Sequence, residues 1–134
     1  MTDPLIDINN YSPSLTISQL IKFCEKKGFL VTKGMIQNYI RVGLLPNPVN
    51  KRFYTHKHIA ALIIVCLTKP VYEIESIKKA LLPHMDEEGL PIETYQKIFS
   101  FCAAKANAFT AELNEADSIN YMTSASLAVG NRAF

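Results

Sequence analysis

The segment GMIQNYIRVGLLPNPVNKRFYTHKHI, residues 34–59, decides how this chain is organised. It opens with a helical pattern, breaks at GLLP (43–46), passes through a basic and aromatic run, KRFY (51–54), and enters a second apolar stretch. The prolines exclude helix across 46–48, whereas the aromatic run favours extended backbone. We therefore expect a helix at about 33–42, a short hairpin or loop at 44–54, and another helix from residue 56.

Capping residues set the other helix boundaries. Thr16 and Gln19 form a capping-box pattern before an apolar face, which predicts a helix over 17–27 that ends at Gly28. Thr32 is a suitable N-cap for the helix at 33–42. Thr55 caps a helix over 56–68 that is apolar all round, which is typical of a helix at the centre of a domain. A fourth amphipathic helix follows at 73–82.

The remaining segments complete the expected domain organisation. Residues 1–14 are predicted to be an N-terminal arm, with the alternative that their apolar side chains dock on the body, and 15–84 the first domain. The acidic turn at 85–90 marks a plausible boundary before a helical region at 91–129. Apolar residues there alternate at steps of three and four, a heptad seam that favours dimerisation or packing on the chain's own helices. The seam residues assigned to a dimer interface are Ile92, Tyr95, Phe99, Cys102, Ala106, Phe109 and Leu113.

Charge is distributed unevenly along the 134 residues. Residues 16–57 hold eight basic residues and one acidic residue, whereas 61–134 hold six basic and nine acidic residues. This asymmetry indicates a polyanion partner for the first half, or a solvated surface that is lopsided by chance.

Several other classes of protein are disfavoured. The three cysteines are widely spaced within apolar patterns, as in a reducing compartment. His56 and His58 diverge at the solvated start of a helix, and His84 stands alone in an acidic turn, so we expect no metal site, no cofactor and no enzyme activity. Met1–Pro13 lacks a leader pattern and no apolar run is long enough for a membrane span, so we expect a cytoplasmic protein.

The helix at 33–42 has a polar outer face. On a helical wheel Met35, Ile36, Tyr39 and Ile40 share one side, and the other side carries basic and amide residues without an acid. Amide side chains can pair bidentately with adenine, and arginine with guanine or phosphate. The candidate DNA-binding residues on this helix and on the basic turn are Thr32, Lys33, Gln37, Asn38, Tyr39, Arg41, Lys51 and Arg52.

From about Leu15 to Leu82 the chain resembles the DNA-binding domain of MerR-type regulators. The matching motifs are TISQL (16–20), YIRVGLLP (39–46), RFYT (52–55) and IESIKKAL (74–81), in the family's order. The resemblance implies a winged helix-turn-helix, with 33–42 as recognition helix and 46–54 as wing, and a homodimer formed by C-terminal helices.

Two features depart from the family pattern. Gln37 and Asn38 replace the usual Arg-Tyr before Tyr39, which removes a phosphate-gripping arginine, and the wing is short. The C-terminal half lacks the cysteines of metal-sensing members, so the resemblance is to a bacterial branch of small MerR-like proteins.

The sequence thus predicts an all-α protein with a minimal β wing, acting as a transcription regulator that binds double-stranded DNA as a homodimer. Its operator, its effector and the sign of regulation stay open. A MerR-like fold that serves as a protein interaction module without DNA binding is the first alternative. A small enzyme or ligand carrier that uses the C-terminal helices is the second.

Overall fold

The protein is predominantly helical in the computed structural model, which describes residues 2–106. The helices are α1 (Ile17–Lys26), α2 (Lys33–Arg41), α3 (His56–Thr68) and α4 (Ile74–Leu81), with the short 3₁₀ turns η1 (Ile8–Asn10) and η2 (Leu82–His84). Residues 92–106 are also helical. Across the described residues, extended pairing consists of three isolated bridges. The all-α prediction is confirmed.

The chain divides into two compact units, Met1–Phe99 and Ser100–Phe134. Most of the second unit lies outside the described residues, and so does the greater part of the predicted region at 91–129. The architecture below is that of the first unit.

The predicted caps are present at α1 and α2. The Thr16 hydroxyl accepts from the Gln19 N–H at 3.3 Å, and the Gln19 carbonyl oxygen accepts from the Thr16 N–H at 2.9 Å. At α2 the Thr32 hydroxyl accepts from the Met35 N–H at 3.1 Å. Gly43, just beyond α2, has a φ of 81°, a left-handed conformation that glycine adopts without a steric penalty.

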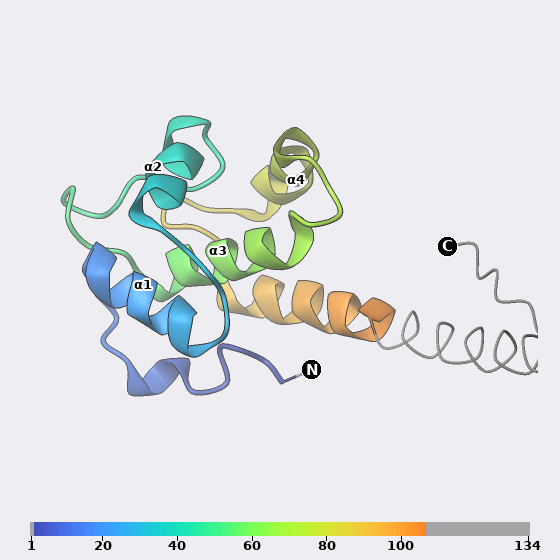
Figure 1. The fold of residues 1–134 in the computed structure, drawn as a ribbon, viewed down its shortest axis with the longest axis horizontal. Coiled ribbons are helices and arrows are strands. Elements are labelled where there is room, and N and C mark those ends of the chain that lie inside the picture. The colour runs from blue at the N-terminus through green and yellow to red at the C-terminus, as the bar shows by residue number, and fades with distance from the viewer. Residues whose placement is uncertain (1, 107–134) are drawn as a thin grey trace, which may run out of the picture. The chain divides into compact units, whose positions relative to one another are not determined.

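Helix α3 lies at the centre of the first unit, with α1, α2 and α4 around it (Figure 1). Every residue from position 58 to position 65 is buried, as the all-round apolar pattern predicted. Fully burying one isoleucine or leucine side chain contributes roughly 1.5–3 kcal/mol. This helix is therefore a major source of apolar stabilisation and the support on which the neighbouring turns rest.

The N-terminal segment packs on the body, the second of the two possibilities that the sequence left open. Leu5 and Ile8 are buried. The Asp7 carboxylate forms an ion pair of 2.7 Å with Lys27 at the end of α1, and this contact lowers the pKa of Asp7. Residues 2–14 therefore belong to the first unit.

The acidic turn at 85–90 is also bound to the first unit. The Leu90 N–H donates to the Lys57 carbonyl in the first turn of α3 at 3.0 Å, and Leu90 is fully buried. The Lys57 ammonium lies 2.7 Å from the Asp86 carboxylate, and this hydrogen bond lowers the pKa of Asp86 and raises that of Lys57. The compact unit continues through this turn to Phe99.

Candidate nucleic-acid interface

Helix α2 presents its polar side to solvent. Ile36 and Tyr39 are buried, whereas Lys33, Gln37 and Arg41 are exposed. Since residues four apart lie on the same side of a helix, these three exposed side chains form one stripe along α2. The burial pattern agrees with the outer face that the helical wheel predicted.

Gly34 on this helix has no role in the fold that requires a glycine. A Cβ at this position would meet only the Thr32 hydroxyl oxygen, at 3.9 Å, and the backbone φ is an ordinary one. Glycine inside a helix costs about 1 kcal/mol relative to alanine. Its benefit is a flat patch of exposed backbone, which allows a ligand to approach closely.

Two of the predicted contact residues on α2 are bonded to each other. An Arg41 guanidinium nitrogen (Nη2) donates to the side-chain carbonyl oxygen (Oδ1) of Asn38. Asn38 is half-buried and Arg41 is exposed, so the bond lies at the surface. This bond uses the carbonyl oxygen of the Asn38 amide, whereas the NH2 group of the amide takes no part in it.

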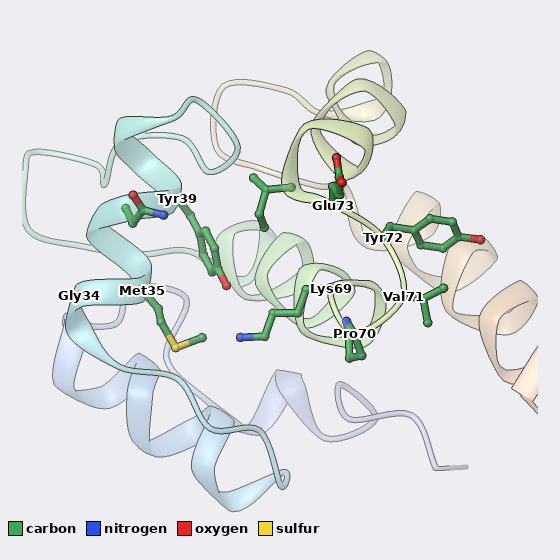
Figure 2. Close-up of a pocket in the computed structure, with 10 residues that line it drawn as sticks. Gly34, Met35, Tyr39, Lys69, Pro70, Val71, Tyr72 and Glu73 are labelled. Atoms are coloured by element: carbon green, nitrogen blue, oxygen red, sulfur yellow. The ribbon is translucent and has the colours of Figure 1, made fainter. Parts of the chain in front are cut away.

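Tyr39 differs from the other predicted contact residues on α2 because it is buried, with 5% of its surface exposed. The wheel placed it on the inner side, although it was also included among the candidate DNA-binding residues. Figure 2 shows its hydroxyl directed into the groove described below. Only that hydroxyl group is positioned for a contact with a bound molecule.

The basic turn after α2 is a minimal hairpin. Val49 and Phe53 form an antiparallel bridge, with hydrogen bonds of 2.8 and 3.0 Å between their backbone groups. Asn50 and Lys51 at its tip have φ values of 53° and 62°, the pattern of the tight turns that favour Asn-Gly. The short hairpin or loop predicted at 44–54 is therefore present as a hairpin with one antiparallel bridge.

Both basic side chains of this turn are exposed. Lys51 stands at the tip, and the Arg52 guanidinium lies 5.4 Å from the centroid of the Phe53 ring. An arginine held against an aromatic ring keeps its charge while losing some of its freedom. The turn therefore offers two cations on a short and well-defined support.

The prediction that His58 lies at a solvated helix start is wrong. His58 is fully buried, its Nδ1 accepts from the Thr55 N–H, and its Nε2 donates to the Asn47 carbonyl, both at 3.0 Å. Burial lowers the pKa of His58, which favours the neutral ring that this bonding pattern requires. The histidine thus completes the cap of α3 and ties the basic turn to it.

A groove of about 790 Å³ runs along α2 (Figure 2). One wall is α2, with Gly34, Met35 and Tyr39, and the other is the connection from α3 to α4. Figure 2 shows the Lys69 side chain extending toward Met35, while the Glu73 carboxylate lies toward α4. The Lys69 ammonium therefore occupies the part of the groove that faces the recognition-helix candidate.

Sequence reasoning missed Lys69. The signal that could have found it is the charge of residues 26–72, which hold eight basic residues and no acid. The sequence count stopped at residue 57 and left out the α3–α4 connection. Only the fold shows that this connection returns to the side of α2.

The cations around α2 have no acidic partners in the first unit. Between residues 2 and 106 the ion pairs join Lys27 to Asp7 and Lys57 to Asp86. The cations left outside these pairs on α2, on the basic turn and in the groove are Lys33, Arg41, Lys51, Arg52 and Lys69.

The predicted dimer seam is partly used inside the chain. Tyr95 and Phe99 are buried, and the Tyr95 hydroxyl donates to the Asp3 carboxylate at 2.8 Å. Ile92, Cys102 and Ala106 are half-buried. Phe109 and Leu113 lie outside the described residues. The first turns of the seam therefore follow the alternative of packing within the chain.

Other kinds of site are not apparent in the part of the chain that the structure describes. No three side chains of His, Cys, Asp or Glu gather there as metal ligands would. Burial raises the pKa of the Cys24 thiol to about 12, which makes it a poor nucleophile. Within residues 2–106 no helix has both the length and the apolar character that crossing a membrane requires.

Residues 7–102 match the family model of a domain of unknown function (DUF1836). The chain belongs to this family. The match covers the N-terminal segment, all four labelled helices and the start of the following helix, so the family's domain agrees closely with the first compact unit. Neither the search of curated proteins nor that of solved structures finds a match.

Proposed function

We propose that this protein binds double-stranded DNA as a transcription regulator of the bacterial MerR-like type, with a winged helix-turn-helix domain at 15–84. Helix α2 enters the major groove and the turn at 49–53 acts as a short wing against the backbone. The observation that carries the proposal is a set of five cations on α2, on the turn and in the groove that have no acidic partner within residues 2–106. Bacterial DNA lies in the cytoplasm, so this function places the protein there.

The geometry supports a division of labour among these residues. Lys51, Arg52 and Lys69 are mobile or planar cations that neutralise phosphates, the contacts that supply most of the affinity for a duplex. Gln37 lies in the middle of the exposed stripe of α2, where a recognition helix reaches base edges. Gly34 allows the first turn of α2 to come close to the DNA backbone, where the N-terminus of a helix favours phosphate.

The interaction-module alternative has one observation in its favour. Val71 and Tyr72, at the edge of the groove, are 74% and 59% exposed. Exposed apolar side chains beside a groove are a common feature of protein-binding surfaces. The two functions differ in their dependence on salt, because phosphate neutralisation makes DNA affinity fall steeply as salt rises.

The decisive experiment is a titration of the full-length protein with selected and random DNA duplexes at two salt concentrations. We expect Arg52→Ala to weaken binding to both duplexes alike and to lower the salt slope by about one. Gln37→Ala should instead cost about 1–3 kcal/mol at one base pair and leave the slope nearly unchanged. Lys97→Ala removes an exposed charge from the helix that starts at 92 and serves as the matched control.

Two results would remove the DNA-binding proposal. One is wild-type protein that binds no duplex at low salt, which favours the interaction module. The other is Arg52→Ala and Arg41→Ala variants that both bind DNA as the wild type does.

A homodimer is the second part of the proposal, and it depends on the seam beyond Phe99. A heptad pattern over Cys102, Ala106, Phe109 and Leu113 provides the apolar stripe that two helices need to pair. Sedimentation at micromolar concentration should give a dimer for the wild type and a monomer for Phe109→Asp. A wild-type monomer at that concentration contradicts this part and leaves the DNA contacts of a single domain to be tested.

A further inference from the structure

The hydrogen bond between Asn38 and Arg41 restricts what the outer face of α2 can recognise. A free asparagine amide offers an acceptor oxygen with two lone pairs and two donor protons, and it pairs with adenine by giving a proton to N7 and accepting one from the N6 amino group. Here one lone pair of the Asn38 oxygen receives a proton from Arg41, so the guanidinium charge lies beside the lone pair that is left. The two donor protons of the amide have no partner among the hydrogen bonds of residues 2–106.

The charge of Arg41 strengthens this restriction. An exocyclic amino group that approached the Asn38 oxygen would bring a second positive dipole next to the guanidinium. A base edge with acceptors only is attracted both by the amide protons and by the remaining guanidinium protons. Residues 26–72 carry no carboxylate, and Glu73, which lines the same groove as Asn38, directs its carboxylate toward α4 (Figure 2).

We propose that Asn38 and Arg41 act as one donor-rich, positively charged unit that favours guanine, and that Arg41 is the positioning residue that sets this preference. Guanine presents N7 and O6 to the major groove, both acceptors, whereas adenine presents N7 and a donor amino group. This inference rests on the proposed DNA-binding function and names the base that the site selects. It replaces the expectation that Asn38 pairs with adenine.

The proposal predicts a change of base preference rather than a simple loss. Without Arg41 both lone pairs of the Asn38 oxygen are available and no guanidinium charge lies beside them, so the amide accepts a proton from adenine more readily. Arg41→Ala should therefore shift the preferred base from guanine toward adenine at the base pair that Asn38 contacts. Arg41→Lys keeps the positive charge but not the planar fork of donors, so it should keep the salt slope while weakening the guanine preference.

The test is selection of binding sites from a random duplex pool by the full-length protein and its variants. The relevant base pair is the one whose preference disappears in Asn38→Ala. There we expect the wild type to favour guanine over adenine by roughly tenfold, and Arg41→Ala to lose or reverse that ratio. Arg52→Ala is the control, since it should lower affinity without altering any base preference, and thermal melting confirms that each variant is folded.

Three results overturn the inference. If the wild-type protein selects adenine at this base pair, the hydrogen bond between Asn38 and Arg41 breaks on binding. If Arg41→Ala leaves the base preference unchanged, Arg41 does not position Asn38. Both leave the proposed function standing. Wild-type protein that selects no sequence at all, at low salt, overturns the inference together with that function.

Discussion

Two short turns lie next to the first turn of α3, and they differ in whether their charged side chains are paired within the described chain. The basic turn bridges Val49 and Phe53, and the acidic turn bridges Asp86 and Gly89. The acidic turn is bound to α3 through the Lys57–Asp86 ion pair and the hydrogen bond from Leu90 to Lys57. On either side of the basic turn, His58 of α3 bonds the Asn47 carbonyl and contacts the Tyr54 ring, and neither contact uses a charge of the turn.

This difference separates charges that hold the fold from charges left available to a partner. The Lys57 and Asp86 charges satisfy each other within the chain, and their pKa shifts, upward and downward, both favour the ionised pair. Lys51 and Arg52 have no such acidic partner within residues 2–106. Exposed ion pairs contribute only about 0–1 kcal/mol, so leaving two cations unpaired costs the fold little.

The largest expected effect comes from Gly89 in the acidic turn. A Cβ there would lie 2.4 Å from the carbonyl oxygen of Lys57, and the φ of 134° disfavours any other residue. Gly89→Ala should therefore destabilise the protein by at least about 3 kcal/mol. Urea unfolding followed by circular dichroism measures this loss.

Gly28 provides the matched control for that substitution. It also has a positive φ, 89°, but a Cβ there would meet no atom within 4 Å. Gly28→Ala should cost only the backbone strain, roughly 1–2 kcal/mol. Equal losses in the two variants would show that the acidic turn is not in close contact with α3.

The next effect is a dependence of stability on pH through His58. Burial lowers the pKa of His58 in the folded protein, although Asp86 and Glu88 oppose that shift. The unfolded chain therefore binds a proton more readily than the folded one, with a pKa of about 6.5. The contribution of His58 is complete above that pH and declines as the solution becomes more acidic.

His58→Gln tests this dependence, because glutamine is the usual third residue of a capping box and does not titrate. The free energy of unfolding should fall between pH 7 and about pH 5 in the wild type and in the control His84→Gln, and should stay flatter in His58→Gln. The carboxylates of Asp7 and Asp86, whose pKa values are lowered, titrate below this window. If His58→Gln loses as much stability between pH 7 and pH 5 as the wild type, groups other than His58 cause the dependence on pH.

Much of the fold followed from local signals in the sequence. Thr16, Thr32 and Thr55 marked the starts of α1, α2 and α3, because each hydroxyl satisfies a backbone N–H that the helix leaves unpaired. The all-round apolar run after Thr55 predicted the central helix. These features depend on residues a few positions apart, which a single sequence displays directly.

The contacts missed by the sequence join distant segments. Nothing near His58 in the chain shows that Asn47 will receive its proton, and Lys69 approaches α2 only because α3 ends where it does. The acidic turn was taken for a boundary because its composition is that of a linker, and its attachment depends on the close approach of Gly89 to Lys57. Such contacts are set by the packing of whole helices.

The smallest expected effect lies at the tip of the basic turn, and it separates the two roles that the comparison assigns. Lys51 has a φ of 62°, where the second tip residue of such a turn is usually glycine. Lys51→Gly should relieve that strain, and since glycine also adds freedom to the unfolded chain, the net gain in stability should be about 0.5 kcal/mol. Lys51→Ala removes the same charge without relieving the strain and should gain no stability.

Both variants should bind random DNA more weakly than the wild type, with a salt slope lower by about one. Stability that rises while the affinity for DNA falls is the pattern expected of a residue that slightly destabilises the fold and contacts the ligand. If both variants bind DNA as the wild type does, the tip of the turn does not reach the phosphates, and contact falls to Arg52 and Lys69.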